Sequence, residues 1–212
     1  MSKKIIGISG VAGSGKDTFF ELLSEEIDCR RYSLADCLKK EVNEWTEKIY
    51  NINAMTCTRL EKEIIRPFLV FHAGMRRTQT EGRYWIDKLD TEINEISPPK
   101  KDGVITRDIS TELQVITDIR FDEYDKDEVY WLKEELNGYL IHISMYKSDD
   151  DPKKRIDKPP ANDAEAKNDP LLREKADYCI EWPELSPFDP KDLKKYVNDF
   201  ILFLNENNKI IK

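Results

Sequence analysis

The sequence predicts an α/β protein in which a parallel sheet is flanked by helices, and three observations lead to this class. Short β-branched segments alternate with longer segments whose apolar residues recur at helical spacing. A glycine-rich turn joins the first strand to the first helix. The 212 residues suit a single domain with a sizeable core. Such alternation favours a sheet covered on both faces, with ligands in the crevice beyond the carboxyl ends of the strands.

The first third of the chain predicts two strands and two helices. Residues 3–9 carry three isoleucines and stop at a glycine, which is typical of a buried strand. Beyond the glycine-rich turn, apolar residues at helical spacing predict an amphipathic helix over 16–27. A short strand over 30–33 then leads into a second long helix over 34–49, whose apolar stripe is continuous.

The middle of the chain predicts two further helices and an exposed connection. Pro67 would interrupt a helix that began at residue 60, so we expect a helix that begins near Arg66 and ends near Gly74. Residues 85–93 repeat at helical spacing. Residues 97–103 contain Pro-Pro and Gly among charged residues and predict a loop.

The last hundred residues continue the alternation around one polar insert. They predict a strand, a helix, a strand, a short strand and a closing helix over 113–119, 125–136, 139–143, 178–180 and 193–204. Between the second and third of these strands, residues 147–170 are rich in Asp, Lys and Pro, and Ile156 is their only large apolar residue. We expect a mobile insert or linker there, because the segment cannot supply core.

Composition excludes several classes of function. The net charge of −8 argues against a broad nucleic-acid interface, which would need basic side chains on phosphates. No apolar run approaches the ~20 residues of a membrane span, and we expect no signal peptide. The four cysteines show no C-x-x-C spacing, so we expect reduced thiols in a cytoplasmic protein.

The most informative motif is the loop over residues 10–16, which follows the pattern G-x-x-x-x-G-K. Glycines let backbone N–H groups turn toward phosphate oxygens, the next helix adds its positive N-terminus, and the lysine reaches the outer phosphates. The alternative is a glycine turn that binds nothing. The predicted phosphate-binding residues are Gly10, Ala12, Gly13, Ser14, Gly15, Lys16, Asp17 and Thr18.

The eighth position of this motif departs from the usual pattern. Most such loops place a Ser or Thr there to hold Mg²⁺, whereas this chain has Asp17, with Thr18 one residue later. Asp17 would hold Mg²⁺ through water or orient Thr18; alternatively, it is an acidic residue favoured in the first turn of a helix.

Several segments together resemble the phage and viral deoxynucleoside monophosphate kinases, within the wider class of nucleoside monophosphate kinases. They are the G-S-G-K-D-T loop and residues 33–39, 66–74, 84–86, 115–121 and 169–180. The resemblance implies a P-loop kinase fold with a helical substrate-binding region over about 34–95 and a lid over about 147–170. It also implies ATP and Mg²⁺ as cofactors and phosphoryl transfer to a (deoxy)nucleoside monophosphate, giving the diphosphate. Phe71 and Met75 depart from the Gln and Thr that are common in the family.

Further site residues follow from charge and from the resemblance. We expect Lys16, Asp118 and Arg120 to be catalytic, with Asp17 and Asp118 holding Mg²⁺ through water. The predicted substrate-binding residues are Lys39, Arg66, Arg76, Arg77, Arg83 and Trp85, and the predicted lid cations are Lys153, Lys154 and Arg155. Each has an alternative: a structural Asp–Arg pair, solvated surface charges, or an aromatic residue of the core.

Two other functions remain open. One is a kinase of another phosphorylated metabolite, similar to the animal phosphomevalonate kinases, which share a G-K-D loop. The other is a nucleotide-binding regulator without catalysis. The partners we expect are small nucleotides, with neither nucleic acid nor membrane. The resemblance leaves a homodimer open, and a virus or phage protein of this kind would act in the host cytoplasm.

Overall fold

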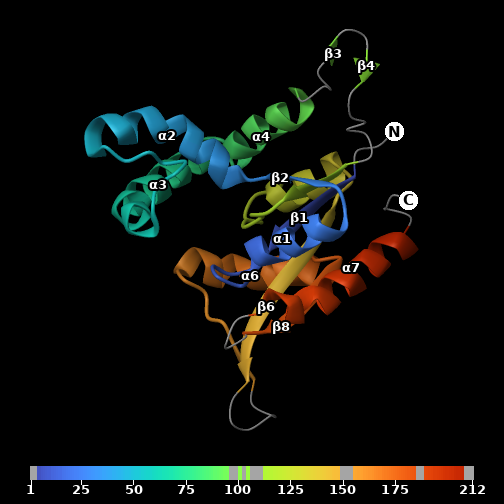
Figure 1. The fold of residues 1–212 in the computed structure, drawn as a ribbon. Coiled ribbons are helices and arrows are strands. Elements are labelled where there is room, and N and C mark those ends of the chain that lie inside the picture. Colours follow the sequence, from blue (N-terminus) through green and yellow to red (C-terminus); the bar gives the residue numbers. More distant parts are fainter. Residues whose placement is uncertain are drawn as a thin grey trace.

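The computed structural model describes residues 4–95, 100–101, 104–105, 112–148, 155–184 and 189–207. These residues form an α/β structure with a mixed, mostly parallel sheet and helices on both of its faces (Figure 1), which confirms the predicted class. The strands of this sheet are β1 (Ile5–Ser9), β2 (Cys29–Tyr32), β5 (Leu113–Ile116), β6 (Tyr139–Ser148), β7 (Arg155–Asp157) and β8 (Tyr178–Pro183). Outside it, β3 (Lys100–Lys101) pairs antiparallel with β4 (Val104–Ile105).

The order of the strands puts β1 in the middle of the sheet. The order is β2-β5-β1-β6-β7, with β8 also paired to β6, and only β7 runs antiparallel to its neighbour. From β1 the chain passes to β2 on one side and later returns to β6 on the other side. The carboxyl end of β1 is therefore the point where the strand order reverses, which is where open α/β sheets bind ligands. Residues 10–16, called the glycine loop below, begin at this point.

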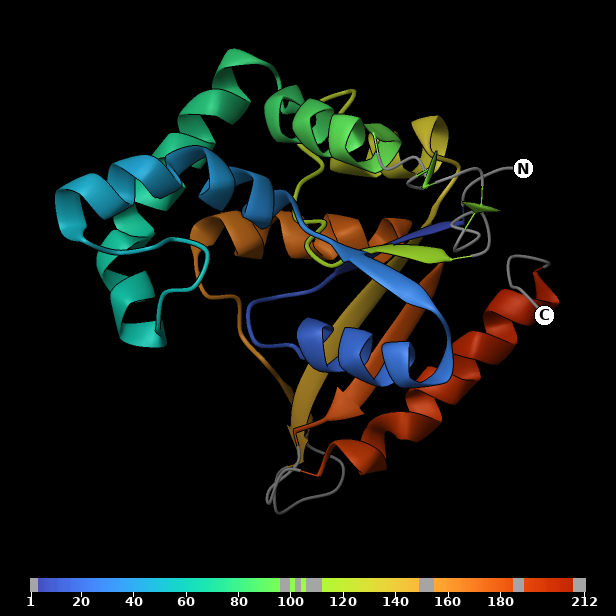
Figure 2. The same ribbon diagram turned by 45° about the horizontal axis from the view of Figure 1, so that its top comes forward.

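Two helices cover one face of the sheet. These are α1 (Lys16–Glu26) and α7 (Lys194–Glu206), which lie side by side in front of the strands (Figure 2). Their apolar stripes match the predicted ones, and Phe19 and Phe200 meet ring edge to ring at 5.5 Å between centroids. Trp182 of β8 belongs to the same fully buried cluster. The 3-10 turn η2 (Pro190–Leu193) leads into α7.

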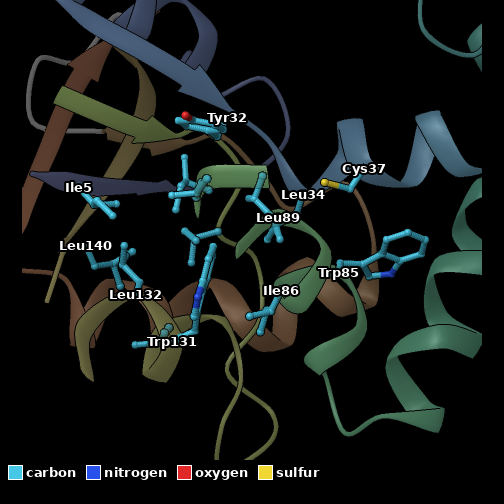
Figure 3. Packing of buried hydrophobic residues seen from close by; sticks show 14 of the residues in the cluster. Ile5, Tyr32, Leu34, Cys37, Trp85, Ile86, Leu89, Trp131, Leu132 and Leu140 are labelled. Atoms are coloured by element: carbon cyan, nitrogen blue, oxygen red, sulfur yellow. The ribbon is translucent and has the colours of Figure 1, made fainter. Parts of the chain in front are cut away.

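The opposite face carries α4 (Arg83–Glu95), α6 (Asp163–Lys175) and a short helix that starts as α5 (Glu128–Tyr130) and continues as the π-helical turn η1 (Trp131–Glu135). Trp131, Leu132 and Ile86 pack with strand residues Ile5 and Leu140 in one cluster (Figure 3). Burial of these apolar side chains on both faces makes the sheet a rigid platform for the loop above it.

A helical lobe stands beside the sheet. It consists of α2 (Leu34–Tyr50), α3 (Arg59–Gln79) and the adjoining α4, at the upper left of Figure 1. A small core of its own joins α2 to α3, with Val42, Ile65 and Leu69 at its centre. This lobe coincides with the region predicted to be helical. No helix in the described ranges has the length and apolar character required to cross a membrane.

The predicted start of α3 is wrong. The helix begins at Arg59 and not near Arg66, and it contains Pro67. Thr58 starts it through a capping box: Thr58 N donates to Glu61 Oε2 at 2.8 Å, and Glu61 N donates to Thr58 Oγ1 at 3.3 Å. A capping box satisfies donors that a helix start otherwise leaves unpaired. Burial of Ile65 and Leu69 on either side of Pro67 stabilises the helix through the position where one backbone hydrogen bond is missing.

The predicted irregular insert over 147–170 is also wrong in its described part. Strand β6 continues to Ser148, β7 adds an edge strand, and α6 begins at Asp163. Asn162 caps α6 by accepting a hydrogen bond from Glu165 N at 2.9 Å. Asn168 and Leu172 of α6 are buried, so the polar segment lies on the protein instead of standing away from it.

Candidate functional site

The glycine loop has backbone angles that require glycine at two positions in particular. Gly10 has a φ of 132°, and a Cβ there would lie 2.2 Å from the carbonyl oxygen of Ile143. Gly15 has a φ of 94°, and its Cβ would lie 2.4 Å from the indole of Trp182. Both positions lie in the left-handed region, and real Cβ atoms do not approach other atoms so closely. The loop can therefore lie against β6 and β8 only because these residues lack side chains.

The loop is held from below by β8. Trp182 is fully buried, and its Nε1 donates to the carbonyl oxygen of Ser14 at 2.8 Å. Ser14 N donates to Val11 O at 3.1 Å, which closes a turn within the loop. Ser14 Oγ is buried and has no hydrogen-bond partner among the described residues. The loop is thus fixed in shape before any ligand arrives, which lowers the entropic cost of binding.

Lys16 lies across this loop at the start of α1. Its Nζ donates to Gly10 O at 2.6 Å and to Val11 O at 2.9 Å. Burial and the nearby charge of Arg120 lower the pKa of Lys16 to about 8, although Glu165, Asp17 and Asp118 act in the opposite direction. A partly buried ammonium beside loop amides at a helix N-terminus is suited to an anion with several phosphates.

Asp118 follows β5, and its carboxylate caps α2. Its Oδ1 accepts a hydrogen bond from Leu34 N at 2.8 Å, and its Oδ2 accepts from Ala35 N and Ser33 Oγ, each at 2.8 Å. The side chain is buried. These contacts give Asp118 a structural role as an alternative to the predicted catalytic one. Its carboxylate fixes the start of α2 beside the glycine loop.

The predicted magnesium residues differ in their surroundings, although the charges of both act on Lys16. Asp17 is exposed in the first turn of α1, whereas both oxygens of Asp118 accept hydrogen bonds from α2. No group of three or more His, Cys, Asp or Glu side chains that could hold a metal ion occurs in the described part of the chain. Of the predicted pair, Asp17 is thus the carboxylate whose side chain is exposed.

Arg120 extends from the same segment as Asp118 and is exposed. Its Nη1 lies 3.9 Å from Glu165 Oε1, and its backbone N donates to Glu128 Oε2 at 2.6 Å. Burial raises the pKa of Glu128 to about 8, against the opposing charge of Arg77. The side chain of Arg120 thus remains accessible beside Lys16, while its backbone is fixed.

Two of the predicted substrate residues belong to the interior, which corrects the prediction. Arg77 is buried, and its guanidinium binds Asp127 with two hydrogen bonds of 3.0 and 2.9 Å and Glu128 at 3.3 Å. Trp85 is also buried, and its Nε1 donates to Ala73 O at 3.3 Å (Figure 3). Neither side chain is available to a substrate.

Two of the other three arginines predicted for the substrate, Arg66 and Arg83, form ion pairs with carboxylates of the protein. Arg66 is exposed and forms a two-point pair with Glu63, three residues earlier on α3. Arg83 pairs with Asp87 and with Glu135, each at 3.0 Å. These contacts match the alternative that they are surface charges, and they leave the lobe with fewer free cations than its sequence indicates.

Arg76 belongs to a group of polar side chains from α2, α3 and α4 that the sequence did not reveal. The Glu41 cluster comprises Glu41, His72, Arg76, Tyr84 and Lys88. Lys88 Nζ and His72 Nε2 each lie 2.8 Å from a Glu41 oxygen, Tyr84 Oη donates at 2.6 Å, and Arg76 Nε lies at 3.5 Å. Burial opposes ionisation of Glu41, but hydrogen bonds from Lys88, Tyr84 and His72 hold its pKa at about 2.

The Glu41 cluster continues into a row of stacked rings. Phe68 stacks on Trp45 at 4.1 Å and on His72 at 5.8 Å between ring centroids. Lys39, closer to the capped end of α2, pairs with Asp36 at 2.7 Å and is partly buried. Glu41 lies about 10 Å along α2 from Leu34, at 1.5 Å per residue. This length of helix separates the Glu41 cluster from the end of α2 that Asp118 caps.

Of the predicted lid cations, Lys153 and Lys154 lie outside the described residues. Arg155 pairs with Asp157 at 2.7 Å and with Glu181 of β8. Lys158, which the sequence reasoning missed, lies over the glycine loop, because a Cβ built on Gly13 would lie 3.0 Å from Lys158 Nζ.

Glu165 is the second residue that the sequence reasoning missed. Its Oε2 accepts hydrogen bonds from Ala12 N at 3.1 Å and from Ala161 N at 2.9 Å. The signal that could have found it is the Asn-x-x-Glu pattern at 162–165, which is typical of a helix start. A helix start at this point brings an acidic side chain onto the glycine loop.

Comparison with known proteins does not identify a family for this chain. No family model matches the chain, and no curated protein matches it.

Proposed function

We propose that the protein is a P-loop kinase that transfers the γ-phosphoryl group of ATP to a (deoxy)nucleoside monophosphate and forms the diphosphate. The observation that carries the proposal is the glycine loop itself. It lies at the reversal point of a mostly parallel sheet, leads into α1, and holds the partly buried ammonium of Lys16 across it. This combination is the one that phosphate binding requires.

On the donor side, different groups would bind the phosphates of ATP and stabilise the charge of the transferred group. Loop amides and the N-terminus of α1 would bind the donor phosphates, and Lys16 would neutralise the outer ones. Arg120 and Lys158 are cations close to the loop, and they would stabilise the charge spread over the transferred group. Mg²⁺ bound to ATP would supply further charge neutralisation, with Asp17 as the residue that holds it through water.

The acceptor side is the helical lobe. Arg76 and Lys88 are partly exposed cations that meet at Glu41, and they would bind the acceptor phosphate together with Lys39. Phe68 and Trp45 offer an aromatic surface beside them. We propose these residues in place of Arg77 and Trp85, which are buried.

A coupled assay of ADP release tests the proposal with each of the four deoxynucleoside monophosphates as acceptor. We expect acceptor-dependent turnover, and Lys16→Ala should lower kcat/KM by about 10²-fold or more, because it removes a charge-stabilising group. Lys62→Ala, at an exposed position on α3, is the matched control and should match the unsubstituted protein.

Two outcomes would replace this function. Turnover with another phosphorylated metabolite and none with nucleotides would indicate the second kind of kinase. The burial of Trp85 favours testing this, because it removes the predicted base-stacking residue from the site. Binding of ATP with no turnover on any acceptor would instead indicate a nucleotide-binding regulator.

A further inference from the structure

Glu165 lies in the first turn of α6, and its side chain reaches away from that helix to the glycine loop. Its carboxylate is largely buried, with 13% of the side chain exposed. Oε2 bridges Ala12 N of the loop at 3.1 Å and Ala161 N at 2.9 Å. Oε1 lies 3.9 Å from Arg120 Nη1. An anion of the protein itself therefore occupies a group of donors that suits a phosphate oxygen.

Capping of α6 does not explain the position of the Glu165 carboxylate. In a capping box, the Glu in the third position of the helix would return to the backbone N–H of the capping residue. Asn162 does cap α6 and accepts from Glu165 N at 2.9 Å, but the Glu165 carboxylate binds Ala161 N and the loop instead. Its contact with Ala12 N joins residues that are 153 positions apart.

The carboxylate lies toward the outer end of the loop. Lys16 Nζ donates to Val11 O, the carbonyl of the residue just before Ala12, and the charge of Glu165 acts on Lys16. The lysine of such a loop reaches the β and γ phosphates. An anion at Ala12 N that acts on Lys16 is therefore placed where the terminal phosphate of a triphosphate would come, close to the Lys158 ammonium over Gly13.

We propose that Glu165 is a tethered anion that occupies the terminal-phosphate position of the glycine loop and is displaced when a nucleoside triphosphate binds. This inference rests on the proposed function, since it takes the loop to be a triphosphate site. Two like charges cannot share one set of donors, so the displacement weakens triphosphate binding. A diphosphate ends one phosphate earlier and leaves Glu165 in place. The residue thus lowers affinity for the triphosphate specifically and couples its binding to movement at the start of α6.

Titration calorimetry with ATP and with ADP, each without acceptor, tests the inference. In Glu165→Gln the side chain keeps its size but loses its charge. We expect this variant to bind ATP about fivefold more tightly or better, while its affinity for ADP changes less than about twofold. Asp163→Asn, an exposed acidic residue in the same turn of α6, is the control and should alter neither affinity.

Glu165→Ala repeats the test without a side chain that can still accept from Ala12 N, and a thermal melt confirms that each variant is folded. The inference is overturned if both folded variants bind ATP as the unsubstituted protein does, or more weakly, or if ATP and ADP gain affinity equally. If neither nucleotide binds to any of the proteins, the donor site itself is wrong, and the proposed function fails together with this inference.

Discussion

The glycine loop and the Glu41 cluster are both polar sites bordered by helices, but they are assembled in different ways. The glycine loop comes from one run of residues between β1 and α1, and Trp182, Lys158 and Glu165 approach it from distant parts of the sequence. The Glu41 cluster takes each member from a different turn of α2, α3 or α4. The difference teaches that a site formed by consecutive residues can be recognised from sequence, whereas one formed by packing can be recognised only from the fold.

The largest effect on ligand affinity should come from filling the space below the glycine loop. Gly15→Ala would require a Cβ 2.4 Å from Trp182 at a φ of 94°, so the loop must move. We expect ATP affinity to fall by about a hundredfold, since a displacement of ~1 Å at a preorganised site can have that effect. Gly74→Ala in α3 is the matched control, because nothing lies within 4 Å of its Cβ. It should stabilise the protein slightly, by about 0.5–1 kcal/mol. Calorimetry and thermal melts measure both, and equal behaviour would contradict the rigid-loop account.

The next prediction concerns stability, and it separates two arginines that look alike in the sequence. Arg77→Ala leaves Asp127 and Glu128 buried without their cation, and we expect the free energy of unfolding to fall by about 3–5 kcal/mol. Arg66→Ala removes one exposed pair with Glu63 and should change that free energy by less than about 0.5 kcal/mol. Urea denaturation measures both values. A small effect of Arg77→Ala would show that Asp127 and Glu128 do not need the cation for stability. Arg77 would then again be a candidate for binding the substrate.

These arginines show how far prediction from sequence reaches. Strands β1, β5, β6 and β8 and most of the helices follow from periodicity, because each buries apolar residues in a pattern that the sequence displays. The exposed strand β7 has no such pattern. Arg66 and Arg77 both lie on α3 eleven residues apart, and only the packing of residues 121–128 against α3 buries one of them. The insert over 147–170 looked irregular for the same reason: α6 buries Asn168 and Leu172, a polar residue and a single leucine, and so has little apolar pattern. Contacts between residues far apart in the chain determine the burial of Arg77 and the structure of this insert. The composition of a segment does not reveal such contacts.

The acceptor side should respond to Arg76 without any change on the donor side. Arg76→Ala removes a guanidinium that lies 3.5 Å from Glu41 and 4.6 Å above the Tyr84 ring. We expect the KM for the acceptor to rise about tenfold, the loss of one charge-assisted hydrogen bond, while the affinity for ATP stays the same. Steady-state kinetics with each substrate varied in turn measure both. An unchanged acceptor KM would move the acceptor phosphate away from the Glu41 cluster, toward Lys39.

The smallest effect is a pH dependence that should appear on the donor side alone. The pKa of Lys16 is lowered to about 8, so the free protein loses this positive charge as the pH rises through that value. If ATP binds only the protonated form, affinity should fall about eightfold between pH 7.5 and pH 9, following the protonated fraction. Lys16→Arg is the sharpest control, because a guanidinium stays charged over this range and should flatten the profile, whatever its own affinity. A profile in Lys16→Arg as steep as that of the unsubstituted protein would assign the titration to another group. Acceptor binding should vary little over the same range, because the pKa of Glu41 is held at about 2 and that of Lys88 is raised by its hydrogen bond to Glu41. The two sites would then differ in their chemistry as they do in their assembly.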